Sequence, residues 1–499
     1  MSNQPVRVRI APSPTGNCHV GTARTALYNY LLARKLGGSF ILRVDDTDTK
    51  RNSLESEQGV FDGLKWIGLT WDEGPDVGGD FGPYRQSERQ DLYHRYAQQL
   101  LNAGLAYECF CTPAELEAER KEQMERKEDP RYSGRCLHLS GAEKAERRAQ
   151  GMTPSLRLKV RDGMVGFHDE IRGRVEQDAG LMGDFVIMKS NGIPIYNFAT
   201  VVDEHEMDIT HVIRAAEHIA NTFPQILLYE ALGWDVPCFA HLVLMLNPDK
   251  TKISKRKGAV YLGEFAELGY LPEALLNFCA FLGWSPGGED AQEILSLEEL
   301  VSLFSLERCT QSNAVFDTVK LDWMNGMWIR RLSAEDLAPR VMPFMQKAGL
   351  IENADEASLA RLADLIGLIH ERLPRLDAAP ESLAYFYQDW TQEEVDTALL
   401  TANKSQKTPS DIAEILAFAR DTIQAQSFAG DAHSVAEHLE QLFKDHATNI
   451  GWKLGDLLMP LRVSLTNRKV SPPLFAMMVL LGKECSLTRI SRALHALQS

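Results

Sequence analysis

Two groups of residues, far apart in the sequence, have types and spacing suited to handling a phosphorylated ligand. The first is the turn APSPTG (11–16), followed by His19, Val20 and Gly21. A histidine can donate a hydrogen bond to a phosphate oxygen, and a glycine at a helix start lets a flat base approach the main chain. The free N–H groups of that helix start attract anions. The group predicts one wall of a nucleotide site, although an ordinary strand-to-helix turn with a structural histidine has the same pattern.

The second group is the basic stretch NPDKTKISKRKG (247–258), which holds five basic residues in the eight positions 250–257. Lys252, Lys255 and Arg256 around Ser254 can surround a polyphosphate and stabilise charge that develops on leaving pyrophosphate. A solvated basic loop or a nonspecific RNA contact remains an open alternative.

A third group has the spacing of a metal site. Cys109, Cys111, Cys136 and His138 read C-x-C, a gap of 24 residues, then C-x-H. Three thiolates and one imidazole form a common tetrahedral set for structural zinc, with no open position for catalysis. The alternative is four unliganded residues in a weakly ordered segment.

The elements around the first group form a recognisable unit. Residues 6–10 read as a β-strand, 21–36 as a helix with one apolar stripe, and 39–44 as a second strand. A strand–helix–strand unit of this length implies a parallel sheet. The turn and His19 then lie at the carboxyl edge of that sheet, where ligands of such folds bind.

The rest of the chain changes character twice. Residues 112–150 are rich in charge and poor in apolar side chains, which indicates a solvated helical or mobile insertion. From about residue 330 the pattern is almost purely helical, and Ser333 with Asp336 has the spacing of a helix N-cap.

Composition limits the class of protein. The 499 residues suggest about three domains, and 53 basic against 69 acidic residues leave a formal charge of −16. Binding of nucleic acid therefore requires a local basic patch. The start of the chain lacks a secretory signal, and no apolar run reaches the ~20 residues of a membrane span. Eight cysteines are too few for a disulfide framework, so we expect a cytoplasmic protein without a membrane partner.

The first two groups together resemble the HIGH and KMSKS signatures of class I aminoacyl-tRNA synthetases. The sequence is most similar to the bacterial-type glutamyl-tRNA synthetase family, and the resemblance runs from about residue 6 to the end. It rests on an ordered set of stretches: RIAPSPTG (9–16), GTARTAL (21–27), LRVDDTD (42–48), IYNFATVVDEH (195–205), VIRAAEH (212–218), NPDKTKISKRKG (247–258), FDTVKLDWMN (316–325) and KLGDLLMPLR (453–462).

The resemblance implies an α/β fold: a Rossmann-type parallel-sheet catalytic domain with an inserted acceptor-binding domain, followed by an all-α C-terminal anticodon-binding region. The implied boundaries are 1–92 and 196–259 for the two halves of the catalytic domain, 93–195 for the insertion with its zinc site, 260–330 for a stem-contact junction and 331–499 for the anticodon-binding region.

The family activates L-glutamate with ATP to glutamyl-adenylate, releases pyrophosphate, and transfers glutamate to the 3′ end of tRNA(Glu). The resemblance therefore implies ATP, L-glutamate and tRNA(Glu) as partners, Mg²⁺ as an aid to catalysis, a structural Zn²⁺ and a monomeric enzyme.

Glutamate has two carboxylates and an ammonium, so a selective pocket needs two cationic clamps and an acceptor. The positions that match the family's glutamate contacts are Arg9, Ala11, Ser13, Asp45, Tyr196, Thr200 and Arg214. Asp45 stands where many relatives have Glu, and a water can bridge the shorter side chain to the amine. Thr200 stands where some relatives have Asn. Structural ion pairs for the two arginines remain an alternative.

The positions that match the family's ATP contacts are His19, Gly21, Glu217, Met245, Lys252, Ser254, Lys255 and Arg256. Of these, His19, Lys252 and Lys255 are the expected catalytic residues. The substrate carboxylate itself attacks the α-phosphorus, so catalysis is positioning and charge stabilisation without a protein nucleophile. Thr22 replaces the second histidine of HIGH, which the family commonly tolerates.

Three alternatives remain. The first is a synthetase of the same class with another tRNA specificity, either one that also charges tRNA(Gln) or a glutaminyl-tRNA synthetase. The helical pattern after residue 330 argues against the latter, whose relatives generally carry a β-barrel there. The second is a small-molecule nucleotidyltransferase, which would leave 331–499 without a role. The third is a non-catalytic tRNA-binding paralogue, against which His19, Lys252 and Lys255 argue.

Overall fold

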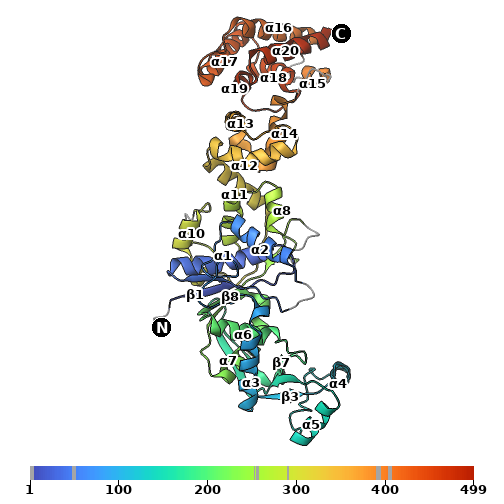
Figure 1. The fold of residues 1–499 in the computed structure, drawn as a ribbon. Helices are drawn as coiled ribbons and strands as arrows, with labels where there is room; N and C mark the ends of the chain where they lie inside the picture. Colours follow the sequence, from blue (N-terminus) through green and yellow to red (C-terminus); the bar gives the residue numbers. More distant parts are fainter. Residues whose placement is uncertain are drawn as a thin grey trace. The chain divides into compact units, whose positions relative to one another are not determined.

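The computed structural model describes residues 5–47, 52–251, 253, 258–288, 292–388, 395–402 and 407–498. The chain divides into two compact units (Figure 1). The first comprises Met1–Ala266 and Pro272–Leu321, and the second comprises Glu267–Leu271 and Asp322–Ser499. Among the described helices, none is long and apolar enough to cross a membrane.

The first unit begins with the predicted strand–helix–strand element. Strand β1 (Arg7–Ile10) and strand β2 (Ser39–Leu42) pair in parallel, and α1 (Val20–Lys35) connects them. The helix buries its apolar stripe, and His19 caps its start. Its end is followed by Gly37, whose φ of 63° favours a residue without Cβ.

A four-stranded sheet in the order β6-β5-β9-β8 continues the fold. Strands β8 (His211–Ala215), β9 (Cys238–Leu242) and β5 (Met164–Asp169) run parallel, whereas β6 (Gly173–Asp178) forms an antiparallel hairpin with β5. The main-chain N–H of Thr210 donates to the Arg7 carbonyl at 2.9 Å, which joins the start of β8 to β1. The carboxyl ends of β1, β8 and β9 therefore share one edge, whereas β5 ends beside Phe239, near the start of β9.

The hairpin differs from the expected layout. Strands β5 and β6 come from the range 93–195 predicted as the insertion, yet β5 pairs with β9 of the catalytic sheet at Asp169 and Phe239. The sheet is mixed with a parallel majority, so the predicted α/β class is confirmed.

The remaining part of that range forms a second small sheet. Strands β3 (Ala106–Cys109), β4 (Ser155–Leu158) and β7 (Val186–Met188) are antiparallel in the order β3-β4-β7. Two surface helices, α4 (Pro113–Glu125) and α5 (Gly141–Ala149), carry the charged segment, and capping boxes begin both of them. The predicted solvated insertion is thus helical.

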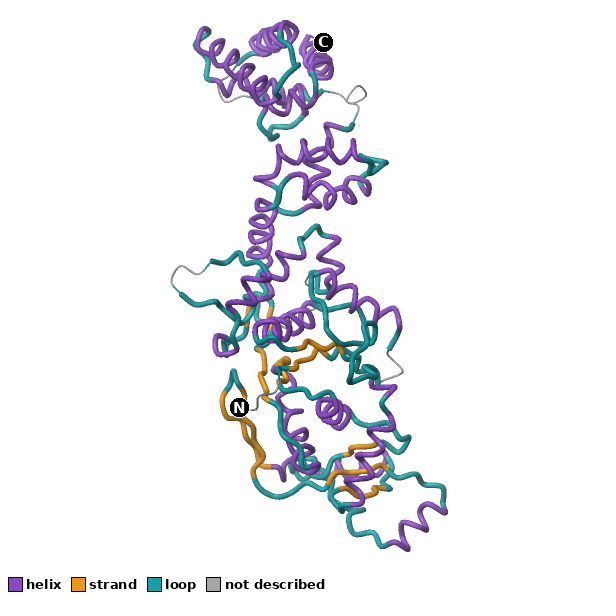
Figure 2. Tube along the Cα trace, turned by 60° about the vertical axis from the view of Figure 1, so that its left-hand side comes forward, coloured by secondary structure: helices purple, strands orange, loops and turns teal. Residues whose placement is uncertain are grey.

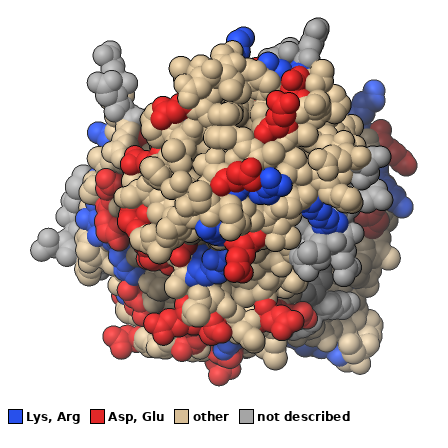
Figure 3. Space-filling view, turned by 90° about the horizontal axis from the view of Figure 1, so that it is seen from above, with Lys and Arg blue, Asp and Glu red and all other residues tan. Residues whose placement is uncertain are grey.

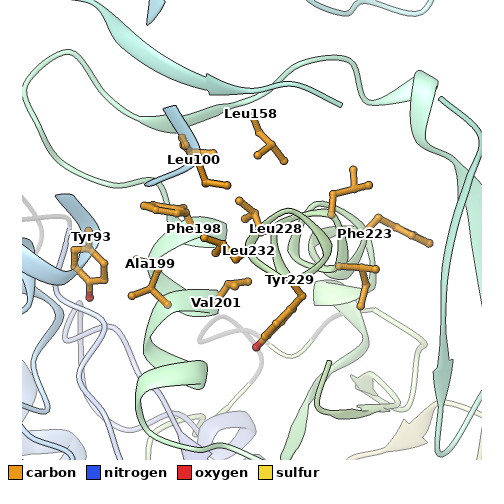
Figure 4. Packing of buried hydrophobic residues seen from close by; sticks show 14 of the residues in the cluster. Tyr93, Leu100, Leu158, Phe198, Ala199, Val201, Phe223, Leu228, Tyr229 and Leu232 are labelled. Atoms are coloured by element: carbon orange, nitrogen blue, oxygen red, sulfur yellow. The ribbon is translucent and has the colours of Figure 1, made fainter. Parts of the chain in front are cut away.

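A large apolar core connects this small sheet to the catalytic one. Helices α3 (Gln90–Asn102), α6 (Tyr196–Glu206) and α7 (Ile219–Leu232) pack together, and Figure 4 shows Leu100, Phe198 and Leu228 within the cluster. Tyr229 belongs to the same core, and its hydroxyl donates to the buried Glu204 at 3.1 Å. The core therefore fixes α6 and α7, which carry several residues of the site.

Further elements complete the first unit. Helix α2 is Leu54–Trp66. Strands β10 (Met245–Leu246) and β11 (Ala314–Val315) form a parallel pair, and β10 directly precedes the basic stretch 247–258 in sequence. Helices α8 (Leu262–Glu267), α9 (Pro272–Ala280) and α10 (Leu297–Leu303) follow that stretch. The first unit has short 3₁₀ turns at Gln86–Glu88, Ala179–Leu181, Ala216–His218 and Leu306–Arg308, and the second unit has them at His370–Arg372, Leu376–Ala378 and Ala384–Phe386.

In its described residues the second unit consists of helices and loops (Figure 2). Its core is formed by apolar residues from 385–494, and Ser333 accepts the Asp336 N–H at 3.1 Å as the predicted N-cap. The helices from 318 onward are α11 (Thr318–Arg331), α12 (Ala334–Lys347), α13 (Glu356–Ile369), α14 (Ala379–Leu383), α15 (Thr397–Thr401), α16 (Pro409–Ala425), α17 (Ala432–Asn449), α18 (Leu454–Thr466), α19 (Leu474–Leu481) and α20 (Lys483–Gln498).

Candidate active site

A cavity of about 520 Å³ lies at the shared carboxyl edge of the strands in the first unit. The end of β1 and its following turn, the start of α1, the end of β8 and the segment before β10 all contribute to its wall. The predicted site residues that line it are Arg9, Ala11, Ser13, His19, Gly21, Asp45, Tyr196, Arg214, Glu217 and Met245. The first sequence group thus lies on the cavity wall together with Met245, which shortly precedes the second group in sequence.

Five predicted residues are not seen at this cavity. Thr200 is buried in α6 with 1% exposure and does not line the wall. Lys252, Ser254, Lys255 and Arg256 lie outside the described residues. Ile253, which is described, lines the cavity.

His19 forms one end of the cavity and is held by its own helix. Its Nδ1 accepts the main-chain N–H of Gly21 at 2.9 Å. Burial lowers the pKa of His19, although Glu264 and Glu217 act in the opposite direction. The imidazole is therefore neutral at pH 7, with its proton on Nε2, where it can serve as a donor to a ligand oxygen.

Gly21 permits close packing at this end. A Cβ at this position would lie 3.1 Å from His19 Nδ1 and 3.4 Å from Met245 Cε. The absence of a side chain at Gly21 therefore lets His19 and Met245 pack closely against the start of α1.

At the other end, Arg9 is held by a buried carboxylate. Its Nε and Nη2 donate to Glu204 Oε1 at 3.0 and 2.7 Å, and its Nη1 donates to the Ile213 carbonyl at 3.4 Å. Arg9 and Glu204 are 4% and 1% exposed. Arg9 therefore forms the structural ion pair of the alternative interpretation, and it also lies on the cavity wall.

Arg214 is held differently. Its Nε donates to His241 Nε2 at 3.1 Å, and its Nη2 donates to Thr222 Oγ1 at 2.8 Å and to Gln225 Oε1 at 2.7 Å. Its Nη1 is buried and has no hydrogen-bond partner in the described structure. A buried donor left in this state is costly, so the geometry favours an anionic ligand atom at this place.

Asp45 is paired with an arginine that sequence reasoning missed. Arg43 Nε and Nη2 donate to its two carboxylate oxygens at 2.7 and 3.1 Å. Burial raises the pKa of Asp45, and the Arg43 charge opposes this rise. Arg43 has no exposed surface and lines the cavity. The signal available in the sequence was only its position two residues before Asp45, on the same side of an extended segment.

Tyr196 and His218 close the wall between α6 and the turn after β8. The Tyr196 hydroxyl lies 3.4 Å from His218 Nδ1. Burial, followed by the charges of Arg214 and Arg9, lowers the pKa of His218 to about 4. His218 is therefore neutral at pH 7, and its pKa responds to the charges of the two arginines.

The cysteine cluster lies in the insertion. The Sγ atoms of Cys109, Cys111 and Cys136 lie within 4.8 Å of one another. The fourth predicted ligand, His138, is exposed and is not part of this group. The Tyr132 hydroxyl instead lies 3.4 Å from Cys109 Sγ and 3.6 Å from Cys111 Sγ. The three clustered thiols can supply three of the four ligands of a tetrahedral zinc ion.

The second unit has a cavity of its own, of about 320 Å³. Arg372, Arg468 and Ser471 line it together with Tyr385. The Tyr385 hydroxyl is buried and has no hydrogen-bond partner in the described structure. On the face shown in Figure 3, basic and acidic side chains are interspersed.

Comparison with known proteins places these features in context. Residues 5–323 match the family model of tRNA synthetases class I (E and Q), catalytic domain, and residues 336–494 match that of an anticodon binding domain. The chain is 43% identical over 491 residues to a glutamate–tRNA ligase of Symbiobacterium thermophilum, which covers 97% of this chain and 99% of that protein. It is 44% identical over 479 residues to one from Carboxydothermus hydrogenoformans, with 96% and 97% covered.

A solved structure is also similar over the full length. It is a glutamate tRNA ligase from Elizabethkingia meningosepticum in complex with its amino acid, with a TM-score of 0.89 and 35% identity. The alignment covers 99% of this chain and 100% of that one.

Proposed function

Because this chain belongs to the class I tRNA synthetases for glutamate and glutamine, we propose that it is a glutamate–tRNA ligase. The observation that carries the proposal is the cavity wall on which Arg9, Arg214 and Asp45 meet. Two buried cations and one carboxylate match the two carboxylates and the ammonium of glutamate. The unpartnered Nη1 of Arg214 supplies a donor that a bound carboxylate satisfies.

At the amino-acid end, Arg9 and Arg214 bind the two carboxylates and Asp45 accepts from the ammonium. Arg43 fixes the Asp45 carboxylate through two hydrogen bonds and keeps it oriented. Tyr196 contributes its hydroxyl, and the turn after β1 contributes Ala11 and Ser13. Thr200, buried in α6, supports the wall of this end rather than the ligand itself.

At the nucleotide end, His19 donates from Nε2 to the phosphates and Gly21 admits the base to the main chain near Met245. Glu217 accepts from the ribose. The loop residues Lys252, Ser254, Lys255 and Arg256 are proposed to bind the polyphosphate. Mg²⁺, which binds ATP through phosphate oxygens, neutralises part of the charge that develops there.

The reaction needs no protein nucleophile. An oxygen of the glutamate α-carboxylate attacks the α-phosphorus of ATP, and the bond to pyrophosphate breaks. A ribose hydroxyl of the 3′-terminal tRNA nucleotide then attacks the acyl carbon, and AMP leaves. The residues of the cavity hold the reacting atoms in line and stabilise the charge on the leaving pyrophosphate.

We further propose a structural zinc ion held by Cys109, Cys111 and Cys136. The segment around these cysteines buries few apolar residues, so a metal ion that cross-links them would stabilise its fold. We propose His138, whose imidazole is an ordinary zinc ligand, as the fourth ligand; the neutral phenol of Tyr132 is not one and can instead donate a hydrogen bond to a thiolate.

Elemental analysis of purified protein tests the zinc proposal. We expect one zinc per chain in the wild type and in Cys238→Ser, whose thiol is exposed and remote from the cluster, and loss of zinc in Cys136→Ser. His138→Ala should weaken zinc binding more than Tyr132→Phe, because an imidazole is an ordinary zinc ligand and a neutral phenol is not. Folded, fully zinc-free wild type would contradict the proposal.

The tRNA then contacts both units. We propose that the segment 93–195 binds the acceptor end and that 260–330 contacts the stem. The region 331–499 binds the anticodon, with the 320 Å³ cavity around Arg372 and Tyr385 taking one unstacked base. We also propose that the protein is a monomer and that it works in the cytoplasm; the absence of disulfides among its eight cysteines, all of them within the described residues, supports the location.

Charging assays with purified tRNAs test the function. We expect transfer of labelled glutamate, and not glutamine, to tRNA(Glu). Charging of tRNA(Gln) with glutamate as well would identify the relaxed specificity, and use of glutamine would identify a glutaminyl enzyme. No transfer to any tRNA, with Mg²⁺ and zinc supplied, would favour the non-catalytic paralogue.

A further inference from the structure

The two arginines of the glutamate end are held by partners of opposite character. Arg9 donates twice to a carboxylate, that of Glu204. Arg214 donates only to neutral acceptors: a histidine nitrogen, a hydroxyl and an amide oxygen. The charge of Arg9 is thus largely compensated inside the protein, whereas the charge of Arg214 remains available to a ligand.

We propose that His241 is a positioning residue for glutamate binding, locked by Asp169 in the tautomer that accepts from Arg214. The inference rests on the proposed function, in which Arg214 binds a carboxylate of glutamate. His241 itself does not line the cavity, so it acts through Arg214.

The sheet places the three residues in a row. Arg214 of β8 and His241 of β9 are register partners, so their side chains project from the same face of the sheet. Asp169 is the last residue of β5, on the far side of β9. Asp169 and His241 have no exposed surface. The row of Asp169, His241 and Arg214 therefore extends from an inner strand of the sheet to the cavity, and its first two members are shielded from water.

Asp169 is fully engaged as an acceptor. Its Oδ1 accepts the main-chain N–H groups of Ile171 and Arg172 at 3.0 and 2.9 Å. Its Oδ2 accepts the main-chain N–H of His241 at 3.0 Å and lies 2.6 Å from His241 Nδ1. A carboxylate that already receives three N–H groups has no proton to give, so Nδ1 must be the donor in the contact with His241.

This assignment fixes the other nitrogen of the ring. With the proton on Nδ1, Nε2 has a lone pair, and it faces the Nε donor of Arg214 at 3.1 Å. The Thr222 hydroxyl also lies 3.1 Å from Nε2 and can donate to it. If Nε2 carried the proton, its N–H and the Nε–H of Arg214 would point at each other in a buried place, and the guanidinium of Arg214, a residue of the cavity wall, would have to move.

The arrangement also explains why a histidine stands here and not a carboxylate. A carboxylate in direct contact would neutralise Arg214, as Glu204 does for Arg9. By placing a neutral ring between Asp169 and Arg214, the fold orients the guanidinium while the negative charge stays one residue away. The Phe239 ring below Arg214, 5.3 Å from the guanidinium carbon, adds support without charge compensation.

A matched pair of variants separates positioning from simple packing. In His241→Gln the amide oxygen can reach the place of Nε2 and accept from Arg214, whereas His241→Phe keeps the ring volume without an acceptor. We expect His241→Phe to raise the KM for glutamate about tenfold or more above that of His241→Gln, because a hydrogen bond to a charged group is lost. The KM for ATP should stay close to wild type in both variants.

Equal KM values for glutamate in the two variants, or a rise of the KM for ATP in parallel, would overturn the inference and leave His241 a packing residue. A wild type that charges no tRNA with glutamate would instead contradict the proposed function. Failure of the proposed function and failure of the inference about His241 therefore give different results.

A measurement on the wild type covers the case in which a variant fails to fold. In ¹⁵N-histidine-labelled protein, the His241 signal, assigned by its loss in either variant that folds or by its nuclear Overhauser contacts to Phe239, should show Nδ1 protonated and Nε2 unprotonated at pH 7. A proton on Nε2 would overturn the proposal.

Discussion

The two ends of the 520 Å³ cavity are built on different principles. The amino-acid end consists of charged side chains that are nearly or fully buried and fixed by hydrogen bonds to other buried groups, as with Arg214, Arg9 and Asp45. The nucleotide end consists of a helix start, a glycine and a neutral histidine, and its proposed lysines come from the loop 247–258.

The difference reflects what each ligand demands. Glutamate is small and is recognised by its charges, so cations must be held in a dry place. Arg214 is held there by neutral partners that leave its charge available, whereas Arg9 shares its charge with Glu204. ATP offers a large base and many phosphate oxygens, which main-chain groups and basic side chains can bind. A substitution at one end of the cavity should therefore impair the use of one substrate and leave the binding of the other nearly unchanged.

The largest effect is expected at the nucleotide end. Lys255→Ala should lower kcat of glutamate activation by about 10²–10³-fold, since it removes a charge that stabilises the leaving pyrophosphate. The KM for glutamate and the affinity for tRNA should change little, as measured by pyrophosphate exchange and filter binding. Lys250→Ala, in the same loop, is the matched control, and an unchanged kcat in Lys255→Ala would remove Lys255 from the catalytic set.

The next effect is expected at the amino-acid end. Arg214→Leu should reduce kcat/KM for glutamate by about 10²-fold, because a desolvated partner of a carboxylate is lost, with the KM for ATP nearly constant. Arg174→Leu, an exposed arginine on β6, serves as the control with the same change of charge. A parallel loss of ATP affinity would show that the two ends are not separable.

A smaller effect is expected for Gly21→Ala. The added Cβ would lie 3.1 Å from His19 Nδ1 and 3.4 Å from Met245 Cε, so we expect the KM for ATP to rise several-fold, to an extent set by how far the Met245 side chain gives way. The free energy of unfolding should hold or rise slightly, because alanine favours a helix over glycine. A change confined to the KM for glutamate would contradict the assignment of this end.

The smallest effects are shifts of two histidine pKa values, followed by NMR titration. After burial, the charges of Arg214 and Arg9 hold the pKa of His218 down at about 4. Bound glutamate would compensate these charges and should raise the pKa of His218. ATP should leave it unchanged and raise instead the lowered pKa of His19, since an anion near a histidine favours its protonated form. Glutamate that moved His19 and not His218 would reverse the two ends.

Linkage gives the sign of the pH effect on stability. The folded protein lowers the pKa of His218 from 6.5 to about 4, so the unfolded chain binds more protons between these values. The contribution of His218 to stability is complete above about pH 6.5 and is lost as the pH falls toward 4. Thermal unfolding at pH 7 and pH 5 should show it as a lower Tm at pH 5, less so in His218→Gln.

Sequence reasoning reached the parts of the fold that local patterns determine. The strand–helix–strand unit of 6–44 and the helical back half follow from periodicity and capping residues. The pairing of β5 with β9 does not, because sheet order depends on contacts between segments about 70 residues apart in sequence.

The candidate site shows the same limit. Residue type and spacing indicate His19, and the resemblance to the family indicates Arg214. Their buried partners, Glu204 and His241, carry no spacing signal, since they arrive from other strands and helices. The contact of the Tyr132 hydroxyl with Cys109 depends on how the loop before Cys136 folds, and the spacing of the cysteines does not reveal it.

The most direct test of the whole account is ATP–pyrophosphate exchange by the intact protein, with glutamate or glutamine and with or without tRNA(Glu). We expect exchange with glutamate, mainly in the presence of tRNA(Glu), and none with glutamine. Exchange that glutamine supports as well as glutamate, or no exchange under any of these conditions, would contradict the reading of Arg9, Arg214 and Asp45 as a glutamate site.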